Sequence, residues 1–203
     1  MENTDKLRFD VPNKVAFIAM PFGTRNTHIV KENVPKNIDF DLIWKNALQP
    51  VLESLGYIAI RADEQGGSVI VKDMLEMLVY ADLVIVDISL PNANVYYEAG
   101  IRHVAKQTGC VLIGTEWAQP VFDLDQIRQV RYPYPQTKPD KNTISEIKTN
   151  LQKGIQYLGN KNSPIYELTE YPNQLNAPNS TAFRETYQQY TNFRLLLSEV
   201  RAQ

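Results

Sequence analysis

Short apolar runs and longer amphipathic stretches alternate along this chain. The apolar runs, each bounded by polar or turn-forming residues, are 14–20, 57–60, 83–86, 110–114 and 130–134. Runs of this length predict strands, and their continuous apolarity predicts burial on both faces. The last run contains Pro133, which is tolerated at the edge of a sheet. The pattern therefore predicts about five strands, with 130–134 at an edge.

The stretches between these runs have helical periodicity. Apolar residues recur at three- and four-residue spacing in 40–56, 68–80, 95–105 and 141–158. This spacing predicts helices with one buried face. Regular alternation of strands and helices predicts an α/β fold, a doubly wound parallel sheet with helices on both faces. We expect a flavodoxin-like strand order, 2-1-3-4-5.

Start and stop signals frame the first helix. We expect Asp39 or Asp41 to cap it, Pro50 to kink or split it, and Gly56 to end it. The preceding segment 21–37 is polar and is predicted to be a long loop.

Composition divides the rest of the chain. We expect a leader at 1–13, an α/β domain at 14–158, an Asn-, Pro- and Ser-rich linker at 159–180 and an amphipathic helix at 181–203. The aromatic stripe of that last helix needs a surface to pack on, either the main domain or a second copy of the chain. We expect a homo-oligomer formed through it.

Charge and composition limit the partners. A net charge of -2 gives no reason to expect nucleic acid or an anionic membrane as a partner, and no apolar run approaches the length of a membrane span. The N-terminus has no apolar signal region, and the single cysteine, Cys110, falls in an apolar run. We expect a reduced thiol and a cytoplasmic protein.

The stretch 81–103 gathers the polar residues of greatest interest. Asp87 and Ser89 follow the central apolar run, Asn92 lies in the next turn, and Asn94 is the expected N-cap of a helix that carries Glu98 in or just past its first turn. Ligands of open α/β sheets bind beyond the carboxyl ends of the strands. We therefore expect Asp87, Ser89, Asn92 and Glu98 to converge on one pocket.

The same stretch carries a family resemblance. Its motif is Asp87-Ile88-Ser89, then Asn92-x-Asn94-Val95-x-Tyr97-Glu98-x-Gly100-x-Arg102-His103. Further matching segments are Ala19-Met20-Pro21-Phe22-Gly23, Arg61-Ala62-Asp63-Glu64 and Phe122-Asp123-Leu124-x-x-Ile127-Arg128.

Over residues 14–158 the chain resembles the nucleoside 2-deoxyribosyltransferase-like and Toll/interleukin-receptor-like superfamily. Within it, the chain is most similar to bacterial relatives of the TRAF- and thioredoxin-binding region of apoptosis signal-regulating kinases. Members of this group range from glycosyl-transferring and NAD-cleaving enzymes to binding modules without known catalysis.

Chemistry and resemblance agree on Glu98. Cleavage of an N-glycosidic bond passes through an oxocarbenium-like state, which a carboxylate can attack or stabilise. The resemblance implies that Glu98 has this role. Asp87 could bind sugar hydroxyls or protonate the departing base, and Ser89 and Asn92 could hydrogen-bond the ribose.

Other residues are expected to complete the substrate site. Pro21, Phe22 and Gly23 would place backbone N–H groups at the mouth of the first strand. Arg61 and Asp63 would meet the far end of a nucleotide. Phe22 and Tyr97 are candidate stacking surfaces for a base.

Each assignment has a structural alternative. Glu98 and Arg102 have the i, i+4 spacing of a surface ion pair. Asp87 could serve solely to cap the turn that follows it. Arg61 and Asp63 could belong to a solvated turn. Asn94 is favoured as a cap.

Three ring side chains have structural alternatives of their own. Tyr97 could be a core aromatic. His103 is favoured as a structural residue, and nothing in the sequence fixes His28 at the site.

Two functional hypotheses remain. The first is an N-glycosidic-bond enzyme acting on a nucleoside, nucleotide or NAD, with no cofactor required. The second is a non-catalytic nucleotide-sensing or protein-binding signalling module. No GxGxxG or Walker-type motif is present, and two histidines and one cysteine far apart provide no zinc signature.

Overall fold

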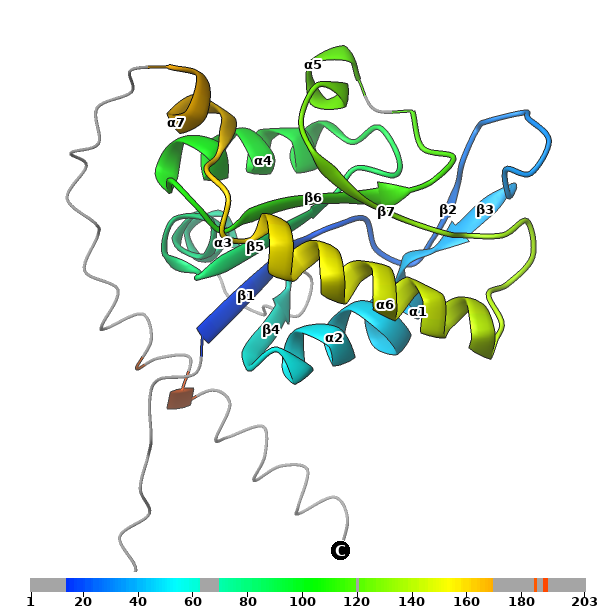
Figure 1. Cartoon of the computed structure of the whole chain (residues 1–203), viewed down its shortest axis with the longest axis horizontal. Coiled ribbons are helices and arrows are strands. Elements are labelled where there is room, and N and C mark those ends of the chain that lie inside the picture. Colours follow the sequence, from blue (N-terminus) through cyan, green and yellow to red (C-terminus); the bar gives the residue numbers. More distant parts are fainter. Residues whose placement is uncertain (1–13, 63–69, 120, 170–184, 186–187, 190–203) are drawn as a thin grey trace, which may run out of the picture.

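Five parallel strands form the centre of the fold (Figure 1). They are β1 (Lys14–Ala19), β4 (Tyr57–Arg61), β5 (Leu83–Asp87), β6 (Cys110–Thr115) and β7 (Gln129–Tyr132). Their spatial order is β4-β1-β5-β6-β7, and every neighbouring pair is parallel. Numbered by their order in the chain, these strands follow the order 2-1-3-4-5. The flavodoxin-like α/β fold class is therefore confirmed.

The structure, a computed structural model, describes residues 14–62, 70–119, 121–169, 185, 188 and 189. The expected leader at 1–13, the first two residues of the helix expected at 68–80, and almost all of the expected helix at 181–203 lie outside these residues. Among the described residues, no helix is both long enough and apolar enough to span a membrane.

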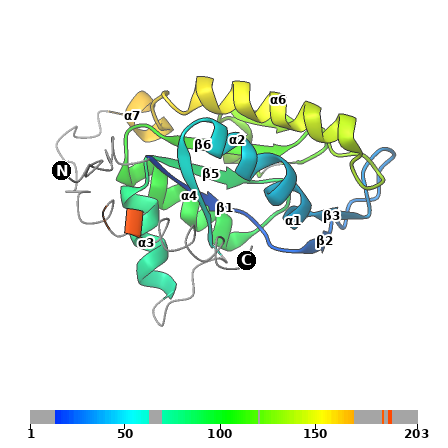
Figure 2. The ribbon, with the colours of Figure 1, turned by 90° about the horizontal axis from the view of Figure 1, so that it is seen from below.

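Helices cover both faces of the sheet (Figure 2). One face carries a three-part helix and a long helix, and the other carries two helices. The first layer consists of α1 (Phe40–Ile43), η1 (Trp44–Leu48), α2 (Gln49–Ser54) and α6 (Lys141–Leu158). The second consists of α3 (Ile70–Tyr80) and α4 (Ala93–Ala105).

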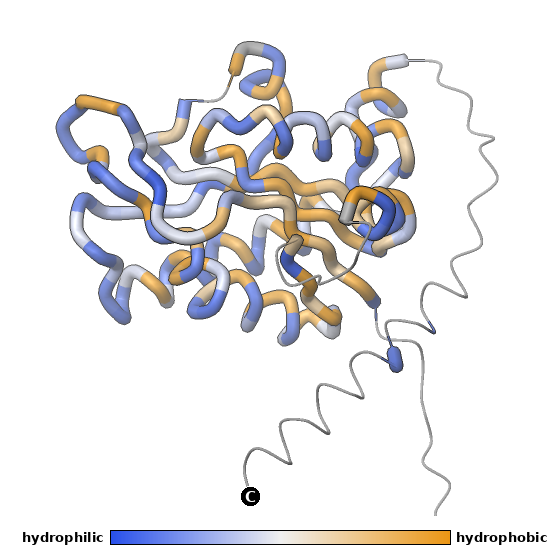
Figure 3. The backbone as a smooth tube through the Cα atoms, turned by 180° about the vertical axis from the view of Figure 1, so that it is seen from behind, coloured by the Kyte–Doolittle hydropathy of each residue, from blue (hydrophilic) through white to orange (hydrophobic). Residues whose placement is uncertain are grey.

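Strand alternation divides the core between these layers. In β1, Ala16 and Ile18 belong to the cluster under α2 and α6, whereas Val15 and Phe17 belong to the cluster under α3 and α4. Successive side chains of a strand point to opposite faces, so a fully apolar run fills both cores. Figure 3 shows the hydrophobic residues of the strands enclosed between helices that carry more hydrophilic residues.

The helix expected over 40–56 is continuous but changes pitch. Asp39 caps α1 by accepting the Leu42 N–H at 3.0 Å. η1 has π-helical geometry and runs directly into α2, which has Pro50 in its first turn. Pro50 has no N–H, and its ring collides with the carbonyl four residues back in a regular helix. The wider π turn fits that requirement, and Gly56 follows the helix end with φ of 81°.

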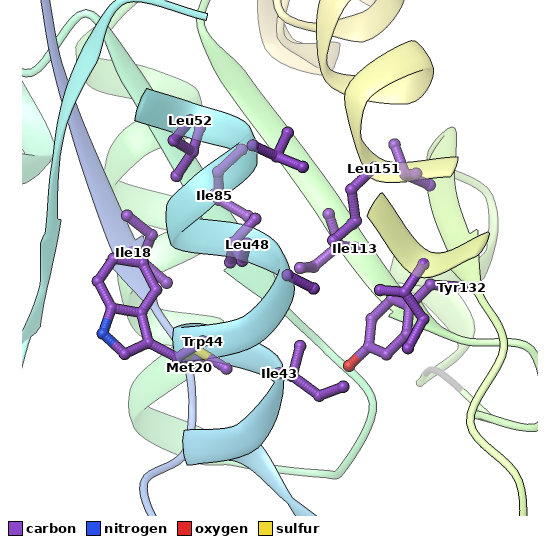
Figure 4. Packing of buried hydrophobic residues seen from close by; sticks show 14 of the residues in the cluster. Ile18, Met20, Ile43, Trp44, Leu48, Leu52, Ile85, Ile113, Tyr132 and Leu151 are labelled. Atoms are coloured by element: carbon purple, nitrogen blue, oxygen red, sulfur yellow. The ribbon is translucent and has the colours of Figure 1, made fainter. Parts of the chain in front are cut away.

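The altered pitch still presents a continuous apolar face. Figure 4 shows side chains of η1 and α2, among them Trp44, Leu48 and Leu52, facing the sheet residues Ile18 and Ile85.

The polar segment 21–37 was expected to be one long loop, and this expectation is wrong. It contains β2 (Thr24–Asn26), which pairs antiparallel with β3 (Asn37–Asp39). Strands of three residues with mostly exposed polar side chains give no period-two apolar signal. Two further short helices were also missed, α5 (Phe122–Asp125) and α7 (Pro164–Leu168).

Candidate functional site

A cleft of about 990 Å³ lies at the carboxyl ends of β1 and β5. Its walls come from the end of β1, the β2–β3 hairpin, the turn after β5 and the start of α4. Its lining includes Met20, Pro21, Phe22, Thr24, Arg25, Asn26, Thr27, His28, Ile29, Ala62, Ser89, Leu90, Pro91, Asn92, Asn94, Val95, Glu98 and Gln119. The location is the one that parallel α/β sheets use for ligands.

The residue that caps α4 is Asn92, which corrects the expectation for Asn94. The side-chain oxygen of Asn92 accepts the N–H groups of Asn94 at 3.0 Å and Val95 at 3.4 Å. Two additional residues therefore join the helix at its start, and Glu98 falls in the second turn. The cap occupies the Asn92 oxygen and leaves its side-chain amide N–H groups for other partners.

Glu98 lines the cleft and is only 8% exposed. Among the residues that the structure describes, none donates a hydrogen bond to its carboxyl group or forms an ion pair with it. Burial alone raises the pKa of Glu98 from 4.5 to about 7. A buried carboxyl group without a compensating partner is a feature of functional sites more than of stable cores.

The expected alternative for Glu98, an ion pair with Arg102, is wrong. Arg102 is fully buried and directs its guanidinium to the backbone. It donates to five carbonyl oxygens, those of Leu78, Ala81, Asp82, Thr108 and Gly109, at 2.9 to 3.4 Å. Burial lowers the pKa of Arg102 to about 10. Arg102 therefore stays charged and ties the end of α3 to the start of β6.

Asp87 is not brought to the cleft with Glu98. Along β5, Val84 and Val86 face the α4 layer, so Asp87 faces the opposite layer. Its carboxylate accepts the Ser89 N–H at 2.8 Å and the Tyr132 hydroxyl at 2.7 Å, and no part of it is exposed. Desolvation raises the pKa of Asp87. This geometry matches the turn-capping alternative and leaves direct contact with a departing base without support.

Ser89 connects that buried carboxylate to the cleft. Ser89 lines the cleft, and its hydroxyl accepts the Thr115 N–H at 3.0 Å and lies 3.2 Å from the Tyr132 hydroxyl. Tyr132 was not a sequence candidate, because it lies on the edge strand far along the chain. Only the β5-β6-β7 pairing brings it to the end of β5.

The segment after β1 is placed as expected, but its N–H groups are partly used. Pro21 and Phe22 line the cleft, whereas the Gly23 N–H donates to Asp41 at 3.1 Å. Asp41 also accepts Arg61 at 2.7 Å, and its pKa is lowered by the Arg61 hydrogen bond first and the Gly23 N–H second.

Arg61 is held by protein groups and does not line the cleft. Besides its ion pair with Asp41, its guanidinium lies 5.5 Å from the ring of Phe22 and 5.8 Å from that of Trp44. These contacts are typical of a structural arginine. The solvated-turn alternative is wrong for Arg61, which is buried, and Asp63 lies outside the described residues.

The remaining candidates are divided between the cleft and other surfaces. Tyr97 is 62% exposed and does not line the cleft, so neither base stacking nor a core position fits it. His103 faces a different cavity. His28, which the sequence left unplaced, lines the cleft from the connection between β2 and β3.

Several cleft residues had no sequence signal. Arg25 and its neighbours on the hairpin line the cleft because the hairpin lies beyond the carboxyl ends of the strands, and Gln119 lines it from the segment after β6. The polar residues 24–26 could have been predicted to form a strand only if their antiparallel partner, β3, had already been identified. No group of three or more metal-ligating side chains occurs within the described part of the chain.

No family model and no curated protein matches this sequence. Among solved structures, the chain is similar to the flavodoxin-like domain of a Synechococcus protein, with 10% identity and a TM-score of 0.42. The match covers 72% of this chain and 98% of that one. The fold class stated above rests on the strand order and pairing.

Proposed function

We propose that this protein breaks N-glycosidic bonds of a nucleoside, nucleotide or NAD, with Glu98 as nucleophile or oxocarbenium stabiliser. The observation that carries the proposal is the state of Glu98: a nearly buried carboxyl group, without a hydrogen-bond partner among the described residues, on the wall of a large cleft. The sequence resemblance to deoxyribosyltransferases and NAD-cleaving enzymes points to the same residue.

The chemistry follows from that environment. As the bond between the anomeric carbon and the base nitrogen breaks, its electron pair leaves with the base and positive charge develops on the sugar. A carboxylate in a poorly solvated site interacts more strongly with that charge than one in water. Glu98 then either bonds to the anomeric carbon or holds the cation until water or another base attacks it.

Neighbouring groups suit a sugar. Ser89 and Asn92 line the same cleft as Glu98. A sugar ring presents hydroxyls that both donate and accept, which these groups can match. The cleft volume of about 990 Å³ is at the upper end of the range for small-molecule sites and can hold a ligand larger than a nucleoside.

The test is product analysis with purified protein, NAD and a panel of nucleosides, deoxynucleosides and nucleotides. We expect release of free base from one substrate class, reduced at least about 1,000-fold in Glu98→Gln, because the amide cannot offer a negative charge. Glu146→Gln, an exposed change on α6, is the matched control and should retain full turnover.

The same panel tests the alternative of a nucleotide-sensing module. Thermal stabilisation by one nucleotide, with no base released by either protein, would support sensing and contradict catalysis. Undiminished base release by Glu98→Gln would contradict the role of Glu98.

A further inference from the structure

A second cavity lies at the opposite end of α4 from the cleft. Its volume is about 390 Å³, and it is bounded by the end of α4, the start of β6, the α5 region, the end of α6, and α7. It therefore sits near the amino ends of the strands. Its lining is His103, Cys110, Leu112, Asp123, Gln126, Ile127, Arg128, Leu158, Lys161, Asn162, Ser163, Pro164, Glu167 and Leu168.

The lining of this cavity combines apolar side chains with the ring of His103 and, at its edge, Ser163, whose hydroxyl donates to the Lys106 carbonyl. Leu112, Ile127 and Leu158 supply apolar surface from a strand, a loop and a helix. His103 faces them, and neither of its ring nitrogens has a hydrogen-bond partner among the described residues. Burial first, and the Arg102 charge second, lower the pKa of His103. Both causes favour the neutral ring, which offers one donor and one acceptor.

The charges around the cavity cancel. Arg128 and Lys161 bring two positive charges, and Asp123 and Glu167 bring two negative charges. None of the four forms an ion pair with a described residue. A balanced rim favours neither an anion nor a cation.

Size, apolar walls and the unpaired ring define a ligand. A cavity of this volume is within the range of small-molecule sites. Apolar walls accept an aromatic ring, and a neutral imidazole pairs with a ring nitrogen or an amide that can donate or accept.

We propose that this cavity is a second ligand site, which binds an uncharged heteroaromatic molecule of roughly nucleobase size through its apolar walls and a hydrogen bond to His103. The proposal does not depend on the function proposed for the cleft, because it rests on different residues at the other end of the helix.

The chain provides one reporter for each site. It has two histidines, of which His28 lines the cleft and His103 lines this cavity. The experiment is a titration of the full-length protein with adenine, nicotinamide and indole, followed by NMR of the histidine rings. His103→Leu and His28→Leu assign the signals. We expect a saturable shift of the His103 signals by at least one probe, with His28 unchanged.

The two variants also serve as matched tests of binding. His103→Leu replaces the ring with an apolar side chain. It should weaken the affinity about tenfold, which corresponds to the loss of one hydrogen bond to a buried polar group. His28→Leu should leave the affinity unchanged. Leu168→Trp, at a mostly exposed position on the rim, should obstruct entry without disturbing the core.

Three outcomes would overturn the proposal. One is the absence of a His103 shift with every probe, and another is a shift confined to His28, which would assign the probe to the cleft. The third is binding of equal strength in wild type, His103→Leu and Leu168→Trp. If no base is released in the cleft assay, the binding measured at the His103 cavity is unaffected, so the two proposals can fail separately.

Discussion

Glu98 and Arg102 are one turn apart on α4, and both are buried charged residues, but their surroundings are opposite. Arg102 donates to five backbone carbonyls and ties three segments together. Glu98 has no hydrogen-bond or ion-pair partner in the described part of the chain and faces a cleft. Burying a charge costs free energy unless hydrogen bonds compensate it. The comparison indicates that Arg102 serves the stability of the fold, whereas Glu98 remains available to a ligand in the cleft.

Replacing Arg102 should have the largest effect on stability. Arg102→Met keeps the length of the side chain but removes five donated hydrogen bonds, although Lys106 still donates to the Ala81 carbonyl and the Val84 N–H to that of Gly109. We expect the free energy of unfolding to fall by about 3–5 kcal/mol, measured by urea denaturation. A loss below about 1 kcal/mol would contradict the structural role given to Arg102.

The pH dependence of base release should separate Glu98 from ordinary surface carboxylates. The active form is the carboxylate, and its pKa is raised to about 7. Turnover should therefore rise with pH and level off above about 8, with about a 100-fold difference between pH 5 and pH 8. A profile that is flat between pH 5 and 8 would contradict the raised pKa or the role of the carboxylate.

Removing the charge of Glu98 should stabilise the protein at high pH. Because burial raises the folded-state pKa from 4.5 to about 7, Glu98 lowers the stability of the fold as pH rises through this interval. Glu98→Gln should be more stable than wild type by as much as ~3 kcal/mol at pH 8, and by less than ~1 kcal/mol at pH 5.

Denaturation curves of both proteins at the two pH values check this prediction. Glu146→Gln provides the baseline, because Glu146 is exposed. Equal stability of Glu98→Gln and wild type at pH 8 would show that the Glu98 carboxylate is better compensated than its surroundings indicate.

The smallest effect should come from the buried network behind the cleft. Tyr132→Phe removes the 2.7 Å hydrogen bond to Asp87 and a neighbour of the Ser89 hydroxyl. We expect a loss of about 1–3 kcal/mol in the free energy of unfolding, with a smaller change at low pH, where Asp87 is protonated. An unchanged free energy of unfolding at every pH would mean that a water molecule replaces the Tyr132 hydroxyl.

Sequence periodicity predicted local elements well where apolar residues repeat. The long helix at 141–158 has the bounds that its apolar stripe indicated, and Asp140 caps it. The hairpin that walls the cleft was missed, because its short strands carry polar side chains whose pairing depends on residues 37–39. The same limit applies to Tyr132, which reaches Asp87 only through the sheet order.

The sequence by itself determined the strand and helix alternation, and it placed Ser89, Asn92 and Glu98 close to the end of one strand. These features follow from local spacing, because a strand, a short turn and a helix leave little freedom. Tertiary structure decided what each polar group faces. The i, i+4 spacing of Glu98 and Arg102 allowed an ion pair, but carbonyls from two segments, 78–82 and 108–109, bind Arg102 instead. Burial and hydrogen bonding depend on neighbours that only the packed fold supplies, and they decide which of two adjacent charges remains available to a ligand.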